Sequence, residues 1–376
     1  MIQRKNINQS SSRNLFSITH PNRHYGCRVN DKIIWNGIQS LILQNELLQI
    51  VIHVEKGSEI TQFLYKPRDI DFIWHNPREL HNPSSLSTAA GSDTSPFLDH
   101  WSGGWFETVP NGGPSCDYKG AHLGFFAETV NIPWHYQILQ DDPDCVKVGL
   151  WVKTYRTPFV LRKTLTIRSN IPALFIEEQL TNESNEDLDY LWMHHPVLGS
   201  PFLDDSCRIN CPECKTIVWE DEDGPDYRMK LNQEGQWPFV EGLDGNKIDL
   251  RQVLSAQSRT MDNTYLTDFK EPWVGVTNSN LGLGFGFAFD PIMWKYMLLW
   301  QGYGGGIGYP WFHSTYHLGI EPWSGFPCAG LDYAIKNKTA NKLKAGKSVK
   351  TWLTAAAYHG NDDIKNISKD GKVTFA

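Results

Sequence analysis

Phe159 to Ile167 reads F-V-L-R-K-T-L-T-I, and Ala173 to Leu180 reads A-L-F-I-E-E-Q-L. Apolar and polar residues alternate through both runs, a pattern typical of β-strands with one buried face. Similar short runs occupy residues 33–35, 40–44, 47–54, 60–65, 146–152, 188–193, 273–276, 281–289, 297–300 and 350–356. They lie close together with turn signals between them, and no amphipathic helix of useful length separates them. The sequence therefore predicts an all-β fold, built as a large antiparallel β-sandwich.

Two segments depart from this pattern. Residues 1–25 are polar and rich in Asn and Ser, which predicts a loose N-terminal arm. Residues 75–100 are rich in Pro, Ser and Asn, which predicts a long surface loop. No linker divides the remaining chain, so we expect residues 26–376 to form a single β-sandwich domain.

Composition and charge narrow the class of protein. The chain of 376 residues has a formal net charge of -7, which gives no basic footprint for nucleic acid. No apolar run reaches membrane-spanning length, and the first residues lack the apolar core of a secretory signal. Seven cysteines, an odd count, fit reduced thiols. We therefore expect a cytoplasmic protein without nucleic-acid or membrane partners.

Three of the cysteines lie close together in the sequence, but their spacing is weak evidence for a metal site. Cys207, Cys211 and Cys214 form C-x3-C-x2-C, which lacks the second ligand pair that a structural zinc site needs. Phosphate-binding and dinucleotide-binding motifs are also missing from the sequence. The sequence therefore predicts no metal and no cofactor.

A carboxylate stands out in residues 313–327, H-S-T-Y-H-L-G-I-E-P-W-S-G-F-P. Glu321 is flanked by apolar residues, and Trp311 and Trp323 lie nearby in the sequence. Loss of solvation there would raise the pKa of the Glu321 carboxyl toward the range that suits a general base. The alternative is an exposed loop glutamate beside a structural tryptophan.

Two histidines end a predicted strand in the segment 192–201, W-M-H-H-P-V-L-G-S-P. Neighbouring side chains of a strand point to opposite faces, so only one of His194 and His195 should face a given pocket. The other interpretation is one surface histidine and one core histidine.

A third segment, residues 101–125, combines glycines with potential sugar-binding side chains. Trp105 offers a stacking face, and Glu107, Asn111 and His122 offer hydrogen-bonding groups. Glycine lets the backbone approach a ligand closely. The alternative is a twisted hairpin plugged by a tryptophan.

Together these segments resemble the galactose mutarotase-like family, which includes the aldose 1-epimerases. The resemblance is carried by His194-His195-Pro196, by Gly319-Ile320-Glu321-Pro322, and more loosely by His122 upstream of Ile132-Pro133-Trp134. It implies the galactose mutarotase-like supersandwich and an isomerase of carbohydrate metabolism that needs no cofactor. Its expected partner is a small-molecule sugar.

The resemblance and the chemistry of anomer exchange together suggest roles for individual residues. Glu321 would be the base, His195 the acid, and His122 would hold the ring-oxygen side of the sugar. The candidate substrate-binding residues are Trp105, Glu107, Asn111, His194, Asp268, Trp300 and Trp323.

The chemistry fits these residue types independently. Exchange of anomers needs a base for the anomeric hydroxyl and an acid for the ring oxygen, which a Glu and a His can supply. Two alternatives stay open: a non-catalytic carbohydrate-binding protein, and a glycoside hydrolase or lyase on the same sandwich. A hydrolase needs two carboxylates facing one bond, and Glu107 with Glu321 would be the candidate pair.

Overall fold

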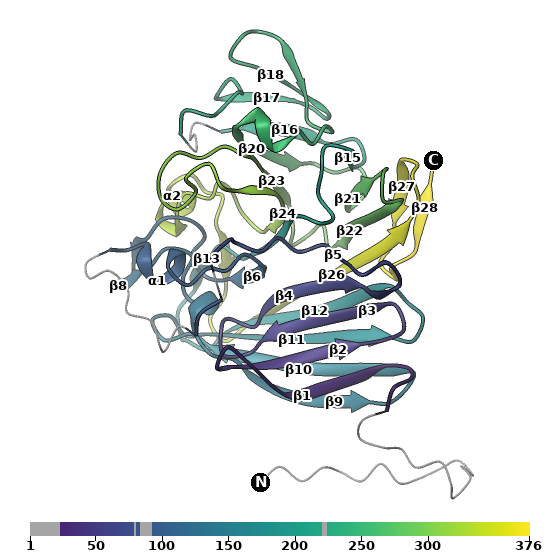
Figure 1. The fold of residues 1–376 in the computed structure, drawn as a ribbon. Coiled ribbons are helices and arrows are strands. Elements are labelled where there is room, and N and C mark those ends of the chain that lie inside the picture. Colours follow the sequence, from purple (N-terminus) through teal and green to yellow (C-terminus); the bar gives the residue numbers. More distant parts are fainter. Residues whose placement is uncertain (1–22, 79, 83–91, 220–223) are drawn as a thin grey trace, which may run out of the picture.

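Two large antiparallel β-sheets packed face to face form most of the molecule (Figure 1). The computed structural model describes residues 23–78, 80–82, 92–219 and 224–376. The predicted all-β sandwich is confirmed. Residues 1–22 of the predicted N-terminal arm lie outside the described residues. Among the described helices, none is long and apolar enough to cross a membrane.

The larger sheet has twelve strands and carries the candidate catalytic residues. Its path is β1 (Arg28–Trp35), β2 (Ile38–Gln44), β3 (Leu48–His53), β4 (Glu59–Tyr65), β6 (Trp105–Thr108), β14 (Met193–Leu198), β24 (Tyr316–Trp323), β23 (Tyr296–Tyr303), β20 (Thr260–Thr267), β16 (Lys215–Val218) and β17 (Gln233–Gln236), with β5 (Ile70–Asp71) beside β4. The centre of this sheet therefore joins strands from distant parts of the chain.

The second sheet has eight strands. Its order is β15 (Cys207–Asn210), β21 (Trp273–Asn278), β22 (Leu283–Phe289), β26 (Ser348–His359), β12 (Ala173–Asn182), β11 (Phe159–Arg168), β10 (Cys145–Lys153) and β9 (His135–Asp141). In Figure 1 β1–β4 lie across β9–β12, which shows the two layers.

Short hairpins, two short α-helices and three 3-10 helices (Lys66–Arg68, Thr129–Asn131 and Ala256–Ser258) accompany the sheets in the described residues. The paired short strands are β7 (Cys116–Tyr118) with β8 (Ala121–Leu123), β13 (Leu188–Tyr190) with β25 (Asn341–Leu343), β18 (Phe239–Glu241) with β19 (Lys247–Asp249), and β27 (Ile364–Ile367) with β28 (Val373–Phe375). The α-helices are α1 (Ser95–Leu98) and α2 (Leu331–Lys336).

Period-two alternation explains the outer strands of the sandwich. In β10 the side chains of Val146, Val148, Leu150 and Val152 are all buried, while the residues between them are more exposed. The buried set joins the main core between the sheets. Removing this apolar surface from water is the main stabilising contribution to such a core.

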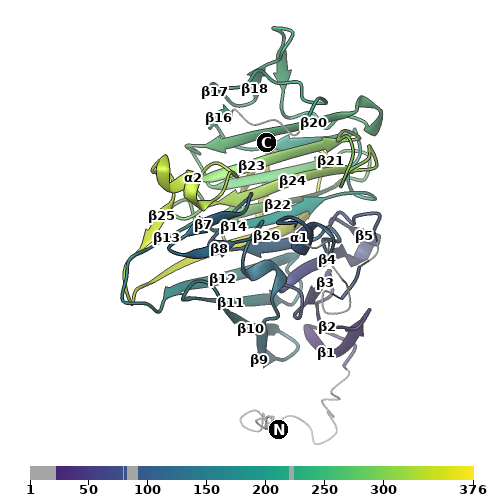
Figure 2. The ribbon, with the colours of Figure 1, turned by 90° about the vertical axis from the view of Figure 1, so that its left-hand side faces the viewer.

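The middle of the twelve-stranded sheet is buried on both faces. Every residue of β14 is buried, and so is every residue of β24 except Tyr316. The inner face meets the eight-stranded sheet, and the outer face is covered by α1 and nearby connecting segments (Figure 2). The described part of residues 75–100 is thus not simply a surface loop, because Phe97 of α1 is buried and packs on Phe106 of β6. Residues 79 and 83–91 of this predicted loop lie outside the described residues. A helical turn places this apolar side chain on the sheet.

Candidate active site

Glu321 and His195 meet on the outer face of the twelve-stranded sheet. The antiparallel register of β14 and β24 pairs Met193 with Trp323, which places His195 beside Glu321. The His195 Nε2 atom lies 3.3 Å from Glu321 Oε1. Their side chains are 7% and 1% exposed. The two residues that the sequence selected therefore form one buried contact.

A glycine makes room for the Glu321 carboxylate. Residues 319 and 321 share a face because side chains alternate along a strand. A Cβ atom at Gly319 would lie 2.6 Å from Glu321 Oε1 and 3.1 Å from Trp300 Cβ. On the other side of the carboxylate, the Trp323 indole N–H donates a hydrogen bond of 3.2 Å to Oε2. The sequence G-I-E-P-W thus supplies both the space and one donor.

Aromatic rings enclose the His195 imidazole. Phe106 stacks on it at a centroid distance of 4.4 Å and an interplanar angle of 19°. Trp101 and Trp300 contact it edge-on at 5.7 and 5.5 Å. These rings exclude water, which strengthens any electrostatic interaction inside the group.

Burial also fixes the charge state of His195. It lowers the pKa of the imidazole to about 3, because the charged form loses its hydration. The ring is therefore neutral at physiological pH. A neutral imidazole has one N–H donor and one nitrogen lone pair, so it can accept a proton on one side and donate one on the other.

Three of the predicted substrate-binding residues lie on the opposite face. Register pairs His194 with Glu107 and His195 with Phe106, so Trp105, Glu107 and His194 point into the core between the sheets. Trp105 donates its indole N–H to His194 Nδ1 at 3.1 Å. The prediction that these three contact a sugar beside Glu321 is corrected by this alternation.

This inner polar group has the donor atoms of a metal site but the wrong charges. One ligand atom each of Glu107, Glu178 and His194 lies within 4.8 Å of the others. However, the Lys163 ammonium is 3.1 Å from Glu107, and the Trp105 donor leaves the imidazole proton on Nε2, which contacts Glu178 at 3.0 Å. A metal cation would have to displace both the Lys163 ammonium and the proton on His194 Nε2, so this group of side chains does not fit a metal ion.

The two buried carboxylates of this group differ in charge. Burial raises the pKa of Glu178 to about 7, and the nearby Glu107 charge adds to the rise. Burial acts on Glu107 in the same direction, but Lys163 and His194 outweigh it and hold the pKa of that carboxyl below its usual value. Glu107 is therefore the ionised partner of Lys163.

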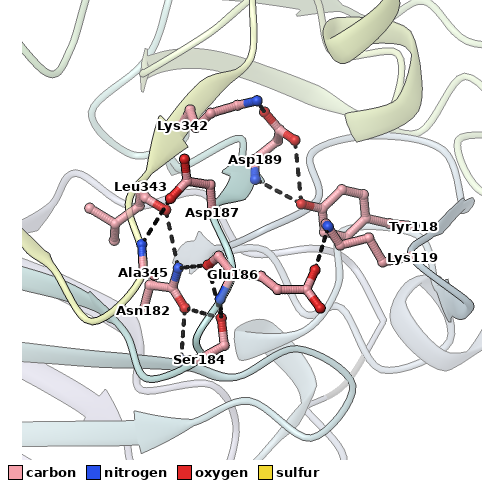
Figure 3. Close-up of polar contacts among 10 residues, drawn as sticks. All are labelled: Tyr118, Lys119, Asn182, Ser184, Glu186, Asp187, Asp189, Lys342, Leu343 and Ala345. Carbon is pink, nitrogen blue, oxygen red and sulfur yellow. Dashed lines mark hydrogen bonds and ion pairs between the residues drawn. The ribbon is translucent and has the colours of Figure 1, made fainter.

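His122 lies outside the buried group. It belongs to the β7–β8 hairpin, where its half-exposed ring contacts Asp117 at 2.9 Å. Figure 3 shows how this hairpin is anchored: the Asp189 backbone N–H donates to the Tyr118 hydroxyl at 2.7 Å. The structure thus separates His122 from the ring contacts around His195, and its predicted place beside the acid is corrected.

Asn111 and Asp268 have structural contacts. The buried Asn111 amide donates to the backbone oxygens of Pro114 and Gly124, both at 2.9 Å, and so holds the loop before the hairpin. Asp268 is exposed and pairs with Lys215 at 2.7 Å. Neither is placed beside Glu321, so their predicted substrate contacts there are corrected as well.

Comparison with known proteins identifies the family. The family model described as "Domain of unknown function (DUF4432)" matches residues 35–356. The chain belongs to this DUF4432 family. No curated protein matches the sequence.

Several solved structures have a fold similar to that of this DUF4432 protein at low sequence identity. A Klebsiella pneumoniae protein, described provisionally as an aldose 1-epimerase, is 15% identical with a TM-score of 0.69, covering 89% of this chain and 84% of its own. A galactose mutarotase-like protein from Clostridium acetobutylicum is 11% identical with a TM-score of 0.60, covering 89% and 99%. A galactose mutarotase related enzyme from Lactobacillus acidophilus is 15% identical with a TM-score of 0.56, covering 87% and 100%. The likeness establishes the fold.

The sequence analysis did not select several residues that surround His195 and Glu321 in this DUF4432 protein. Trp101 and Phe106 lie within the glycine-rich segment. The pairing of β6 with β14 brings Phe106 to His195, and the fold of the chain before β6 brings Trp101 there. His317 has a signal that could have been used: it precedes Glu321 by four positions, so both lie on one face of β24.

Proposed function

We propose that this protein interconverts the anomers of a hexose or related sugar, as an aldose 1-epimerase-like isomerase. The observation that carries this proposal is the His195–Glu321 contact of 3.3 Å, buried under aromatic rings on one sheet face. The descriptions of the similar Klebsiella pneumoniae and Lactobacillus acidophilus proteins support the same kind of chemistry.

The contact distance suits the reaction. The anomeric hydroxyl and the ring oxygen are bonded to the same carbon, so the base and the acid must also lie close together. A sugar placed against the pair, rather than between its members, can present both oxygens at once. Positioning of this kind removes much of the entropic barrier.

Glu321 is the base and His195 the acid in this scheme. The anomeric hydroxyl gives its proton to the Glu321 carboxylate, which passes it to His195 Nε2 across the 3.3 Å contact. His195 releases its other proton from Nδ1 to the ring oxygen as the bond between that oxygen and the anomeric carbon breaks. The ring closes again on the other face of the aldehyde carbon by the reverse transfers, so no proton is gained or lost.

The hydrolase alternative loses its proposed carboxylate pair. Glu107 is paired with His194, whereas Glu321 contacts His195. His194 and His195 are consecutive residues of β14, so their side chains point to opposite faces of the sheet. The two carboxylates are therefore on opposite faces of the sheet, whereas glycoside hydrolysis needs them to flank one bond.

Exchange measurements with a panel of sugars test the proposal. We expect the protein to accelerate anomer exchange of at least one sugar, followed by saturation-transfer NMR. Glu321→Gln and His195→Asn should each slow that exchange by about 10²-fold or more, while the fold remains intact by circular dichroism.

Matched changes control for surface effects. Glu213→Gln and His135→Asn replace exposed residues of the same types and should retain the native rate. Native rates in both Glu321→Gln and His195→Asn would rule out this chemistry, as would a wild-type rate equal to buffer for every sugar.

A further inference from the structure

A second histidine, His317, shares the outer face of β24 with Glu321. It is fully buried, and its ring lies 3.8 Å from the Trp300 ring and 5.1 Å from the Trp74 ring. Its partner in the register is Gly302 of β23, where a Cβ atom would collide with the imidazole. A glycine thus makes room for His317 just as another does for Glu321.

Polar atoms without protein partners gather around Trp300. In the part of the chain that the structure describes, His317 Nε2, His195 Nδ1 and Trp101 Nε1 are buried and make no hydrogen bond. The three rings lie 3.8, 5.5 and 5.9 Å from the Trp300 ring. The other nitrogen of His317, Nδ1, is 2.5 Å from Thr315 Oγ1, which holds the imidazole in place.

These atoms indicate a polar ligand. An unsatisfied buried polar group destabilises the fold, so three beside one indole are expensive to keep without a partner. Burial, followed by the influence of His195, lowers the pKa of His317 well below its ordinary value. Its neutral ring can donate to or accept from a hydroxyl group.

The arrangement has two polar ends and an apolar middle. Trp300 pairs with Gly319, which lies halfway between His317 and Glu321. At a rise of about 3.3 Å per residue, the Cα atoms of residues 317 and 321 are roughly 13 Å apart, and their side chains extend over the indole between them. Such an aromatic platform with a few convergent polar groups suits a sugar ring.

We propose that His317 contacts the substrate, with Nε2 hydrogen-bonded to a hydroxyl on the side of the sugar ring remote from the anomeric carbon. Resting on the proposed function, the inference orients the sugar: the anomeric carbon lies at Glu321 and His195, and the hydroxyl at C3 or C4 lies at His317. It narrows the substrate class to pyranoses with a free hydroxyl there. Trp101 and Trp311 pack on Trp300, so the proposed contact requires one of these rings to move when the sugar binds.

A deoxysugar comparison tests this contact. The wild-type protein is titrated with the preferred sugar and its 3-deoxy and 4-deoxy analogues, and affinity is followed by tryptophan fluorescence. We expect one analogue to bind about tenfold more weakly or worse, because the missing hydroxyl leaves His317 unpaired. His317→Leu should bind the preferred sugar about as weakly, and should no longer distinguish it from that analogue.

This loss of discrimination is a result that a purely structural histidine would not give. His317→Gln, which keeps a polar end, should recover part of the discrimination, and His135→Asn should behave as wild type. Equal binding of all three sugars by the wild type overturns the inference, and this result needs no variant to fold. Unchanged discrimination in a folded His317→Leu protein also overturns it.

Failure of the proposed function would look different. If the wild type binds sugars but does not exchange their anomers, the isomerase proposal fails while the deoxysugar comparison still decides the role of His317. If no sugar in the panel binds, the inference about His317 is wrong.

Discussion

Gly319→Ala is a one-methyl test of the proposed base. Gly319 faces the same side as Glu321, and the added Cβ would lie 2.6 Å from Glu321 Oε1. Ordinary van der Waals contact begins near 3.4 Å, so the carboxylate has to move by about 0.8 Å. The carboxylate is the end of a flexible side chain, and it will yield before the strand does. We therefore expect the His195–Glu321 contact of 3.3 Å to be lost.

The two consequences of this methyl group differ in size. Overpacking of a core by one carbon costs about 1–3 kcal/mol. For a chain of 376 residues the entropy of unfolding is about 0.8 kcal/mol per kelvin, so the melting temperature should fall by only about 1–4 °C. A displacement of about 1 Å in a reacting group can slow a reaction by about 10²-fold. The exchange rate should therefore suffer far more than stability.

The assay combines anomer exchange by NMR with thermal unfolding of the same preparation. Gly149→Ala on β10 is the matched control, since a Cβ there would meet its nearest neighbour, Leu139 Cδ1, at 3.3 Å. It should leave the exchange rate unchanged. A folded Gly319→Ala protein that exchanges anomers within about twofold of wild type would show that the observed carboxylate position is not the working one.

Two further predictions concern pH. Burial lowers the pKa of His195 to about 3, so kcat/KM for anomer exchange should show no fall centred near pH 6.5; such a fall, measured by NMR from pH 5 to 8, would contradict the neutral buried ring. Burial and the Glu107 charge raise the pKa of Glu178 to about 7, so the folded protein keeps a proton that the unfolded chain has already released above about pH 4.5. The free energy of unfolding should therefore decrease by up to a few kcal/mol as pH rises from about 4.5 to about 7. Glu178→Gln should flatten this pH dependence in urea unfolding. An equal pH dependence in both proteins would refute the raised pKa of Glu178.

Local sequence patterns predicted much of the fold, because alternation is a local property. The runs at 146–152, 159–167 and 173–180 became β10, β11 and β12. The segment that covers the outer face of the twelve-stranded sheet has no such alternation. Phe97 and Trp101 come from a segment without strand or helix periodicity. Phe97 packs on Phe106 of the neighbouring strand β6, and Trp101 packs on His195 of β14, which is more than ninety residues away.

The candidate site was predicted in part for a similar reason. A period of two shows that His194 and His195 face opposite ways, but it does not show which faces the core, because a shift of one residue exchanges the two faces. One contact between distant residues removes this ambiguity. Once His195 is known to touch Glu321, the register with β6 assigns Phe106 to the same face and Glu107 to the other.

The same argument extends along β24. Glu321 on the outer face requires His317 and Trp323 to lie there too, and it requires Ile320 to lie in the core, as the structure has them. A single long-range pairing therefore carries the information that local patterns lack. It also explains why His195 and Glu321 come together while Glu107, which was chosen for its residue type alone, lies on the other face, since the register decides what each residue meets.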